Sequence, residues 1–260
     1  MSIDLEFHGA AGEVTGSLYV IRTGAHTLLL ECGLIQGGRE AEKRNRDPFP
    51  LPVDDIDAVI LSHAHIDHSG RVPLLARRGY AGPVHTQNAT RALCRIMLPD
   101  SGYLHEKDAE WDNRKRRKQG KPLVEPLYTL EDAQNCLGQF QGHRYDEPFE
   151  PVPGVTVTFH DAGHILGSAI VELTFHEGGG KKSLVFSGDL GYRDAPVMDP
   201  PARIGQADAV MMESTYGDRQ HRPFAETMEE LTGVFETARA NRGNIMIPAF
   251  TVGRTQDLLY

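Results

Sequence analysis

Four side chains that can bind a metal ion fall within six consecutive residues of this chain: His63, His65, Asp67 and His68. Imidazole and carboxylate groups in this mixture are ligands that zinc and similar divalent ions accept. One or two such residues are commonly solvated loop residues. Four of them, with only an alanine and an isoleucine interleaved, favour metal binding. Their uneven spacing favours two neighbouring ions over one closed site.

The motif directly follows the apolar run 58–61, which is typical of a short buried strand. Alternate residues of a strand point to the same side. We therefore expect His63 and His65 to leave the sheet on one side. The turn that follows brings Asp67 and His68 round to a second point nearby.

Two further candidate ligands follow other predicted strands. His164 lies in a glycine-containing loop between the alternating segments 155–159 and 169–175, and it fits a third imidazole for the first ion. Asp189 follows the apolar segment 183–186, at a point where a carboxylate can bridge two cations and reduce their mutual repulsion. Alone, each would be an ordinary loop residue. The four-ligand motif upstream favours a metal-binding role for both.

The segment 63–68 resembles the His-x-His-x-Asp-His signature of the metallo-β-lactamase superfamily. Other segments resemble its β-CASP branch of RNA-processing nucleases, which includes ribonuclease J and the cleavage factor of messenger-RNA 3′-end formation. These segments are residues 162–168, 187–191, 213–217 and 248–256. The resemblance runs from the first predicted strand to the last residue.

This resemblance implies a hydrolase that cuts single-stranded RNA with the help of two Zn2+ ions. It divides the ligands between the two ions, with Asp189 shared: His63, His65 and His164 for the first, Asp67 and His68 for the second. It also implies that Asp67 helps to orient the attacking water. Glu213 matches the acid that the family calls motif A, which implies a catalytic role for Glu213.

Glu31 follows the predicted strand 27–30 and departs from the superfamily pattern. The superfamily usually has an aspartate at this position, which orients a metal-binding histidine. Glu31 is longer by one methylene group. Either it reaches the same partner through a shifted backbone, or its support for the histidine is weakened.

The resemblance predicts an α/β fold with mixed sheets, the αββα sandwich of the superfamily. We assign residues 1–208 to the metallo-β-lactamase domain, and residues 209–260 to its last strand and the start of a β-CASP cap. In the family, further motifs lie beyond position 260. We therefore expect this chain to be a fragment that binds metal and cleaves RNA poorly. The family's general acid is among those further motifs, and loss of a general acid lowers the rate by about 10²–10⁴.

A long helix is predicted over residues 89–118, with an interruption at 99–102 where Pro99 stands. It ends in the one strong basic cluster of the chain: Arg114, Lys115, Arg116, Arg117 and Lys118. Charge runs are commonly solvated helix faces, but with an RNA substrate this cluster is a candidate contact for phosphates. His85 lies alone in the preceding strand, and we predict a structural role for it.

The composition is that of an ordinary soluble globular protein, with 40% hydrophobic and 24% charged residues. No apolar run approaches the roughly 20 residues of a membrane span, so we expect no membrane contact. Three cysteines without pair spacing favour reduced thiols and a cytoplasmic location. The net charge of −9 argues against a generally basic nucleic-acid binder. Bound divalent ions and local basic segments can still receive phosphates. A homodimer is compatible with the resemblance.

Two alternatives stay open. A hydrolase of small esters or thioesters with the same fold would share the four-ligand motif, but it would not need the segments 213–217 and 253–256. A non-catalytic RNA-binding or assembly subunit typically loses ligands, whereas all six ligand positions are occupied here. Both endonuclease and exonuclease activity are compatible with these motifs.

Overall fold

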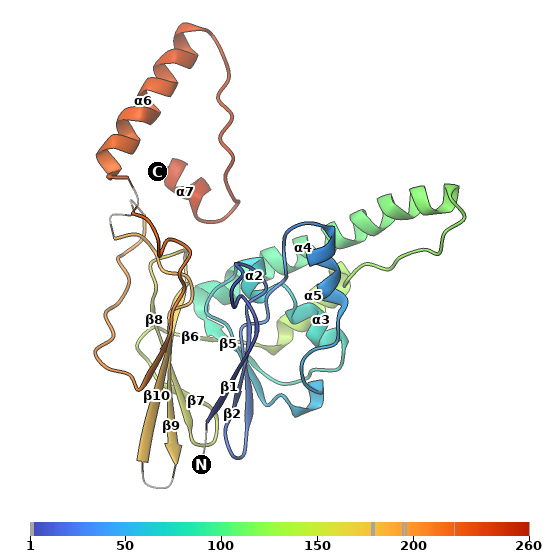
Figure 1. Cartoon of the computed structure of the whole chain (residues 1–260), viewed down its shortest axis with the longest axis vertical. Coiled ribbons are helices and arrows are strands. Elements are labelled where there is room, and N and C mark those ends of the chain that lie inside the picture. The colour runs from blue at the N-terminus through green and yellow to red at the C-terminus, as the bar shows by residue number, and fades with distance from the viewer. Residues whose placement is uncertain (1–2, 178–179, 194, 196, 221, 260) are drawn as a thin grey trace.

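The computed structural model describes residues 3–177, 180–193, 195, 197–220 and 222–259. Two mixed sheets face one another, and helices cover the outer face of the first sheet (Figure 1). The predicted α/β fold with mixed sheets is confirmed. The site argued from the sequence lies where strands of both sheets end.

The first sheet holds six strands in chain order: β1 (Asp4–Gly9), β2 (Leu18–Arg22), β3 (Thr27–Leu30), β4 (Ala58–Ile60), β5 (Val84–Gln87) and β6 (Phe140–His143). The pairs from β1 to β3 are antiparallel, and those from β3 to β6 are parallel. Leu30 of β3 pairs with Ile60 of β4. Because parallel strands end at the same edge, Glu31 and the metal motif leave the sheet side by side.

The second sheet has the order β11-β10-β9-β8-β7, and its pairs are antiparallel except β10 with β11. Its strands are β7 (Phe149–Val152), β8 (Val155–Asp161), β9 (Ala169–Glu177), β10 (Gly180–Phe186) and β11 (Ala209–Met211). The β8–β9 connection carries His164, and the exit from β10 carries Asp189. Both loops therefore reach the same end of the sandwich.

Seven helices have described bounds: α1 (Arg39–Lys43), α2 (Ile66–Ser69), α3 (Val72–Arg77), α4 (Asn88–Lys118), α5 (Leu130–Cys136), α6 (Phe224–Ala240) and α7 (Arg254–Leu259). Single 3-10 turns occupy Arg44–Arg46, Val53–Asp55 and Leu137–Gln139. Thr129 and Asp132 form a capping box at the start of α5, in which each side chain accepts from the other residue's backbone N–H.

Successive side chains along the strands of the first sheet point to opposite faces and pack into two separate cores. Leu28, Leu30 and Ile60 face the second sheet, where they meet residues such as Phe159 and Leu173. Their neighbours along the strands face the helices instead, in a core formed with Val59, Leu61, Leu75, Leu98 and Tyr128. Burying one such aliphatic or aromatic side chain stabilises the fold by about 1.5–3 kcal/mol. Both faces of β3 and β4 are thus fixed beneath the motif.

The prediction that α4 is interrupted at residues 99–102 is wrong, because the helix continues through Pro99. A proline inside a helix costs about 3 kcal/mol, so packing must offset it. Ser101 is buried and hydrogen bonds through Oγ to the hydroxyl of Tyr128 at 2.7 Å. A Cβ on Gly102 would lie 2.6 Å from the carbonyl oxygen of Thr129, so only glycine permits this approach. Tertiary contacts therefore override the local signal.

Helices α6 and α7 stand away from the sandwich (Figure 1). No residue of either helix is buried. β11, by contrast, is hydrogen bonded to β10 as the edge of the second sheet. None of the helices among the described residues is long and apolar enough to cross a membrane.

Candidate metal centre

The motif residues leave the first sheet at the end of β4 and enter a single turn of helix, α2. The backbone N–H groups of His68 and Ser69 both donate to the carbonyl of His65, at 3.0 and 2.9 Å. This turn brings the ring of His68 back toward His63, and the two ring centroids are 4.1 Å apart. The two points predicted for the motif therefore lie next to each other.

The segment after β3 holds α2 in place through its backbone. Cys32 N–H donates to the carbonyl of His68 at 2.8 Å, and Ser17 N–H donates to the carbonyl of Asp67 at 3.0 Å. A Cβ on Gly33 would lie 1.6 Å from that Asp67 oxygen, so the approach is possible only for glycine. The glycine-containing loop before β2 thus ends against the metal motif.

One group of four potential ligands converges: His63, His65, His164 and Asp189. Nδ1 of His65 is 3.1 Å from Nε2 of His63 and 3.2 Å from Nε2 of His164. Oδ2 of Asp189 is 3.8 Å from the first of these Nε2 atoms and 3.6 Å from the second. Residues from β4, the β8–β9 loop and the end of β10 thereby enclose one point.

The other oxygen of Asp189 faces a second point. Oδ1 of Asp189 is 3.2 Å from Nε2 of His68, and that nitrogen is 3.7 Å from Oδ2 of Asp67. Asp189 is therefore placed between the two sets of donors, with one carboxylate oxygen toward each. The structure brings together all six side chains that the sequence proposed as ligands.

Glu31 is fully buried and supports His68 directly. Its Oε2 accepts a hydrogen bond from Nδ1 of His68 at 2.5 Å. This bond leaves Nε2 of His68 directed at Asp67 and Asp189. The backbone of Glu31 is left-handed, with a φ of 65°. The longer side chain of Glu31 therefore reaches the metal-binding histidine, and it does so from a left-handed backbone.

Ser62 extends the same support to His63, a role that the sequence argument missed. The backbone N–H and the hydroxyl of Ser62 donate to the two carboxylate oxygens of Glu31, at 2.6 and 2.9 Å. Because that hydroxyl proton is used, Oγ accepts from Nδ1 of His63 at 2.9 Å. Nε2 of His63 is left to face the other donors. Ser62 directly precedes the first histidine of the motif, and this position is the sequence signal that could have indicated its role.

Burial keeps the imidazoles of the first group neutral. Desolvation lowers the pKa of His63 well below its ordinary value and lowers the pKa of His65 to about 4. Desolvation also lowers the pKa of His164. A neutral imidazole can offer its lone pair to a cation without first losing a proton.

His68 behaves differently from the other three histidines. Burial alone would lower its pKa, but hydrogen bonds to Asp189 and Glu31 raise the pKa of His68 well above its ordinary value. Burial would raise the pKa of Asp189, yet its hydrogen bond to His68 holds that pKa below the usual range. The second set is therefore an imidazolium between carboxylates until a cation replaces the proton.

The donor set fits a zinc-like ion on chemical grounds. Two donors bound tetrahedrally to one zinc at about 2.0–2.1 Å lie about 3.3 Å apart, and the donor pairs of the first group are separated by 3.1–3.8 Å. In the neutral rings these nitrogens lie within hydrogen-bond distance of one another. A cation would take the place of these hydrogen bonds, and the carboxylate of Asp189 would offset part of its charge.

A family model described as the metallo-β-lactamase superfamily matches residues 11–249, which is most of the chain. The chain belongs to the metallo-β-lactamase superfamily. The predicted superfamily is thereby confirmed, and membership implies a metal cofactor.

Relatives within this superfamily carry names from RNA metabolism. Ribonuclease TTHA0252 of Thermus thermophilus is 40% identical over 252 residues, which cover 97% of this chain and 53% of that protein. Transcription termination factor FttA of Methanocaldococcus jannaschii is 32% identical over 260 residues, 99% of this chain and 38% of the factor. FttA of Methanosarcina mazei is 34% identical over 259 residues, which cover 96% of this chain and 38% of that factor. The chain spans about half the length of the ribonuclease. These names agree with the RNA-processing branch that the motifs predict.

Glu213 lies just beyond β11 and contacts the loop that carries Asp189. Its Oε1 accepts from the backbone N–H of Leu190 at 2.7 Å, and its own N–H donates to Oγ of Ser187 at 3.1 Å. Glu213 is also close enough to His164 for its charge to raise the pKa of that imidazole against the larger effect of burial. In this superfamily member, Glu213 thus fixes the residue next to the shared carboxylate.

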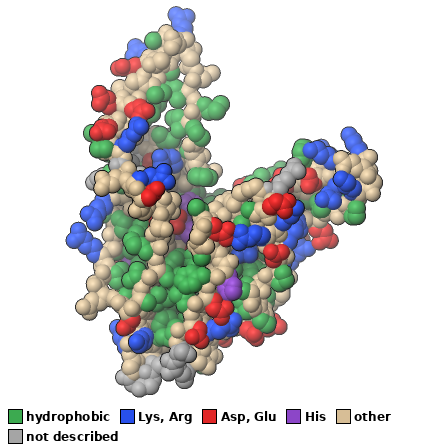
Figure 2. Space-filling view, in the orientation of Figure 1, with side chains coloured by type: hydrophobic (Ala, Val, Ile, Leu, Met, Phe, Trp, Pro, Cys, Tyr) green, Lys and Arg blue, Asp and Glu red, His purple; other side chains and the backbone are tan. Residues whose placement is uncertain are grey.

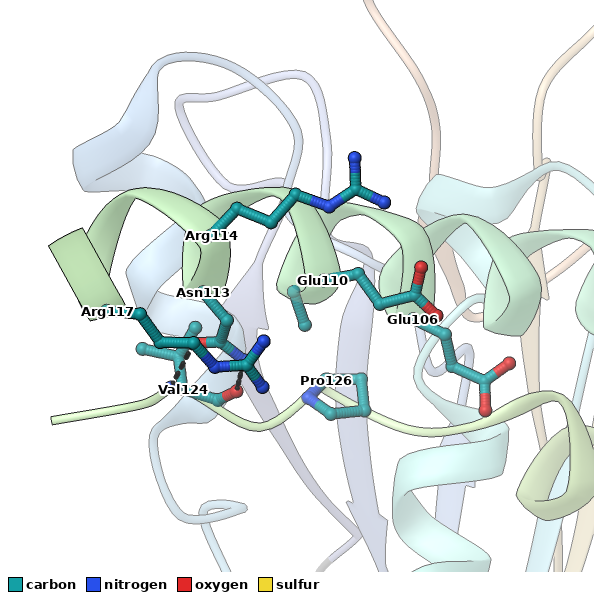
Figure 3. Close-up of a pocket in the computed structure, with 8 residues that line it drawn as sticks. Glu106, Glu110, Asn113, Arg114, Arg117, Val124 and Pro126 are labelled. Atoms are coloured by element: carbon teal, nitrogen blue, oxygen red, sulfur yellow. Dashed lines mark hydrogen bonds between the residues drawn. The ribbon is translucent and has the colours of Figure 1, made fainter.

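The basic cluster is not part of the metal centre. It occupies the far end of α4, where blue side chains gather at the tip of the protruding helix (Figure 2). A helix rises about 1.5 Å per residue, so Arg114 lies about 36 Å along the axis from Thr90 near the helix start. Arg116 donates to the carbonyl of Pro122 at 3.1 Å. Arg117 and Arg114 line a pocket beside the returning segment (Figure 3). The cluster's contact with RNA stays a prediction.

His85 is not alone, contrary to the sequence argument. The parallel pairing of β5 and β6 places Nε2 of His143 3.0 Å from Nδ1 of His85. The ring of His143 also stacks on Phe149, with centroids 3.5 Å apart. Desolvation lowers the pKa of His85 to about 4. The buried His85 and the half-buried His143 form a neutral pair between the sheets.

Proposed function

We propose that this chain carries the catalytic centre of a zinc-dependent ribonuclease that hydrolyses phosphodiester bonds of RNA. The observation that carries the proposal is the placement of Asp189, whose two oxygens face two different sets of donors. A carboxylate that bridges two cations is the usual core of a two-metal site for phosphoryl chemistry. The relatives' names favour RNA over small esters and thioesters.

In this proposal each ion has its own ligands, and Asp189 is shared: His63, His65 and His164 hold the first ion, and Asp67 and His68 hold the second. Two bound zinc ions supply an acidified water and positive charge for the phosphate oxygens. Asp67 would orient the attacking water by accepting its hydrogen bond. Glu31 and Ser62 would keep His68 and His63 with their Nε2 lone pairs toward the site. Glu213 would hold the Asp189 loop and add negative charge near His164.

The finer parts of the proposal concern the intact protein. Its substrate would be single-stranded RNA, met in the cytoplasm. Residues 1–208 would form the metallo-β-lactamase domain, and 209–260 its last strand together with the start of a β-CASP cap. A homodimer belongs to the same proposal, and sedimentation of the purified protein tests it.

Zinc content and RNA cleavage together test the catalytic proposal. We expect about two zinc ions per chain by elemental analysis, and metal-dependent cleavage of a labelled single-stranded RNA. His65→Ala should lose cleavage and metal. The matched control is His176→Ala, because His176 is exposed on β9 and far from the other donors. Cleavage that survives His65→Ala would exclude the metal mechanism. Two zinc ions without cleavage would favour an RNA-binding or assembly subunit.

A further inference from the structure

The outer half of α4 presents an exposed face on which aromatic and basic side chains alternate. Tyr103, Lys107, Trp111 and Lys115 follow one another at four-residue intervals, the spacing that places side chains on one side of a helix. About half of the surface of Tyr103 and of Trp111 is exposed, at 47% and 54%. We call this surface, together with Arg114 and Lys118, the aromatic–basic face.

The opposite side of α4 is already occupied, which fixes the direction of this face. The Asn113 side chain donates to the carbonyl and accepts from the N–H of Val124, both at 2.8 Å. Ala109 is buried on the same side. Figure 3 shows the returning segment below the helix and the guanidinium of Arg114 above it, so Arg114, which also lines the pocket there, lies at the edge of the aromatic–basic face. The aromatic–basic face therefore points away from the protein.

The charge on this part of the chain is opposite to that of the whole. Residues 114–121 hold six cationic side chains in eight positions, whereas the chain has a net charge of −9. Lys107 is paired with Glu110 at 3.0 Å. Among the described residues, none forms an ion pair with Arg114, Lys115 or Lys118. These three cations are available to an anionic partner.

Cations and rings are also in contact on this face. Nζ of Lys115 lies 3.8 Å from the ring centroid of Trp111, and Nζ of Lys107 lies 5.4 Å from that of Tyr103. A flat ring next to a cation is what a nucleotide with an unpaired base requires, since the base stacks on the ring and the phosphate meets the cation. A protein partner with an apolar surface fits this face less well, because its binding would remove water from the cations without replacing their hydrogen bonds, which costs free energy.

The helix connects this face to the metal centre. Near its start, Oγ1 of Thr90 donates to the carbonyl of Gly167 at 2.7 Å, in the loop that carries His164. Trp111 is 21 residues further on, about 32 Å along the helix axis. A strand bound on α4 can therefore continue toward the metal centre.

We propose that the aromatic–basic face of α4 binds single-stranded RNA away from the metal centre. Bases stack on Tyr103 and Trp111, and phosphates contact Arg114, Lys115 and Lys118. The rings are eight residues apart, about 12 Å along the axis, so they take two different bases. The choice of RNA as the partner rests on the proposed function. The face adds affinity for long substrates and leaves the chemistry at the metal centre unchanged.

Trp111 is the single tryptophan of the chain, so its fluorescence reports on this face alone. The test titrates the protein with an unstructured 20-nucleotide RNA, and with a 4-nucleotide RNA too short to span α4. We expect saturable quenching by the long RNA, weakened by salt. Duplex RNA of the same sequence, whose bases are not free to stack, and polyphosphate, which has none, should quench little.

Variants separate stacking from charge, with affinity followed by anisotropy of labelled RNA. Trp111→Ala should weaken binding of the long RNA on the order of tenfold, and Trp111→Phe should restore most of it. Lys115→Gln should lower the slope of log K against log salt by about 0.7. Lys181→Gln is the matched control, because Lys181 is exposed and, like Lys115, forms no ion pair with the described residues, but it lies on β10.

Several outcomes would overturn the proposal: no quenching by the long RNA, unchanged affinity in Trp111→Ala, or equal responses to duplex RNA and polyphosphate. DNA of the same sequence that binds at least as tightly overturns the assignment to RNA. A dimer that dissociates in Trp111→Ala without a change in RNA affinity would make the face a self-association surface. His65→Ala should leave the quenching intact. Quenching without cleavage in the wild type would thus refute the catalytic proposal alone, and cleavage without quenching would refute this one.

Discussion

The metal centre and the outer half of α4 hold their polar side chains in opposite ways. At the metal centre, Glu31 and His63 are completely buried, and they contact residues from separate parts of the chain, among them Ser62 and His164. On α4, Tyr103 and Trp111 are half exposed and contact residues one helical turn away. The first region is fixed by the fold before any ligand arrives, whereas the second has only local contacts. A substitution should therefore cost stability in the first region and only binding in the second.

Glu31→Ala should give the largest effect on stability. It removes the acceptor of three buried hydrogen bonds, two from Ser62 and one from His68. Removing one partner of a buried charged pair costs about 3–5 kcal/mol, and we expect the free energy of unfolding to fall by about 3 kcal/mol in urea titrations of metal-free protein. The left-handed backbone is equally unfavourable for alanine and glutamate, so it does not contribute to the difference.

Glu13→Ala is the matched control for this loss. Glu13 makes a bidentate pair with Arg44 on the surface, and exposed pairs contribute less than about 1 kcal/mol. Equal losses in the two variants would mean that burial and connection of Glu31 do not matter, and the contrast between the two regions would fail.

Glu31→Asp tests whether the unusual acid is matched to its backbone. Aspartate is shorter by one methylene group, and from the same left-handed position it cannot reach both Ser62 and His68. Loss of a group that orients a metal ligand typically lowers metal affinity 10–100-fold. We expect a decrease in that range by competition with a chromophoric zinc chelator. Zinc binding as tight as in the wild type would show that the backbone moves to compensate.

The pH dependence of zinc binding should differ between the two sets of donors. The pKa of His65 is lowered to about 4, and those of His63 and His164 are lowered too, so these imidazoles are neutral near pH 7 and each keeps one nitrogen lone pair free. The pKa of His68 is raised, so its Nε2 is protonated there and must release the proton to bind a cation. Binding should therefore tighten with rising pH only for the second ion.

Calorimetry in buffers of different ionisation enthalpy measures this difference directly. The first zinc equivalent should release almost no proton at pH 7, and the second about one. One released proton makes affinity rise about tenfold per pH unit while His68 stays protonated in the free protein. Equal proton release for both equivalents would contradict the separation of the two sets.

The sequence was sufficient for the features that depend on local order along the chain. His63, His65, Asp67 and His68 follow a short apolar strand, and strand ends at one edge of a sheet gather side chains. That logic, with the family resemblance, located the end of the sandwich to which His164 and Asp189 also come. The capping box that starts α5 is local in the same way, because residues 129–132 form it.

Features that depend on pairing between distant segments were not readable. The role of Glu31 depends on its left-handed backbone, with a φ of 65°, and the neighbouring residues do not indicate this conformation. His143 becomes the partner of His85 only through the register of β5 and β6. The continuation of α4 through Pro99 depends on Gly102 lying against the backbone of Thr129. In each case a contact from elsewhere in the fold outweighed the local signal.

Trp111→Ala should give the smallest effect on stability, although it removes the largest side chain of the aromatic–basic face. Half of the indole is already in water, and its closest charged neighbour, Lys115, can turn into solvent without leaving a buried group unpaired. Surface substitutions of this kind change the free energy of unfolding by less than about 0.5 kcal/mol. Urea titrations should compare Trp111→Ala with Tyr128→Phe. Tyr128→Phe is the buried reference, because the Tyr128 hydroxyl forms a hydrogen bond with Ser101 in the core beneath the same helix. If Trp111→Ala lowered the free energy of unfolding as much as Tyr128→Phe, the outer half of α4 would depend on its exposed face for folding. The exposed side chains would then have a structural role besides binding a partner.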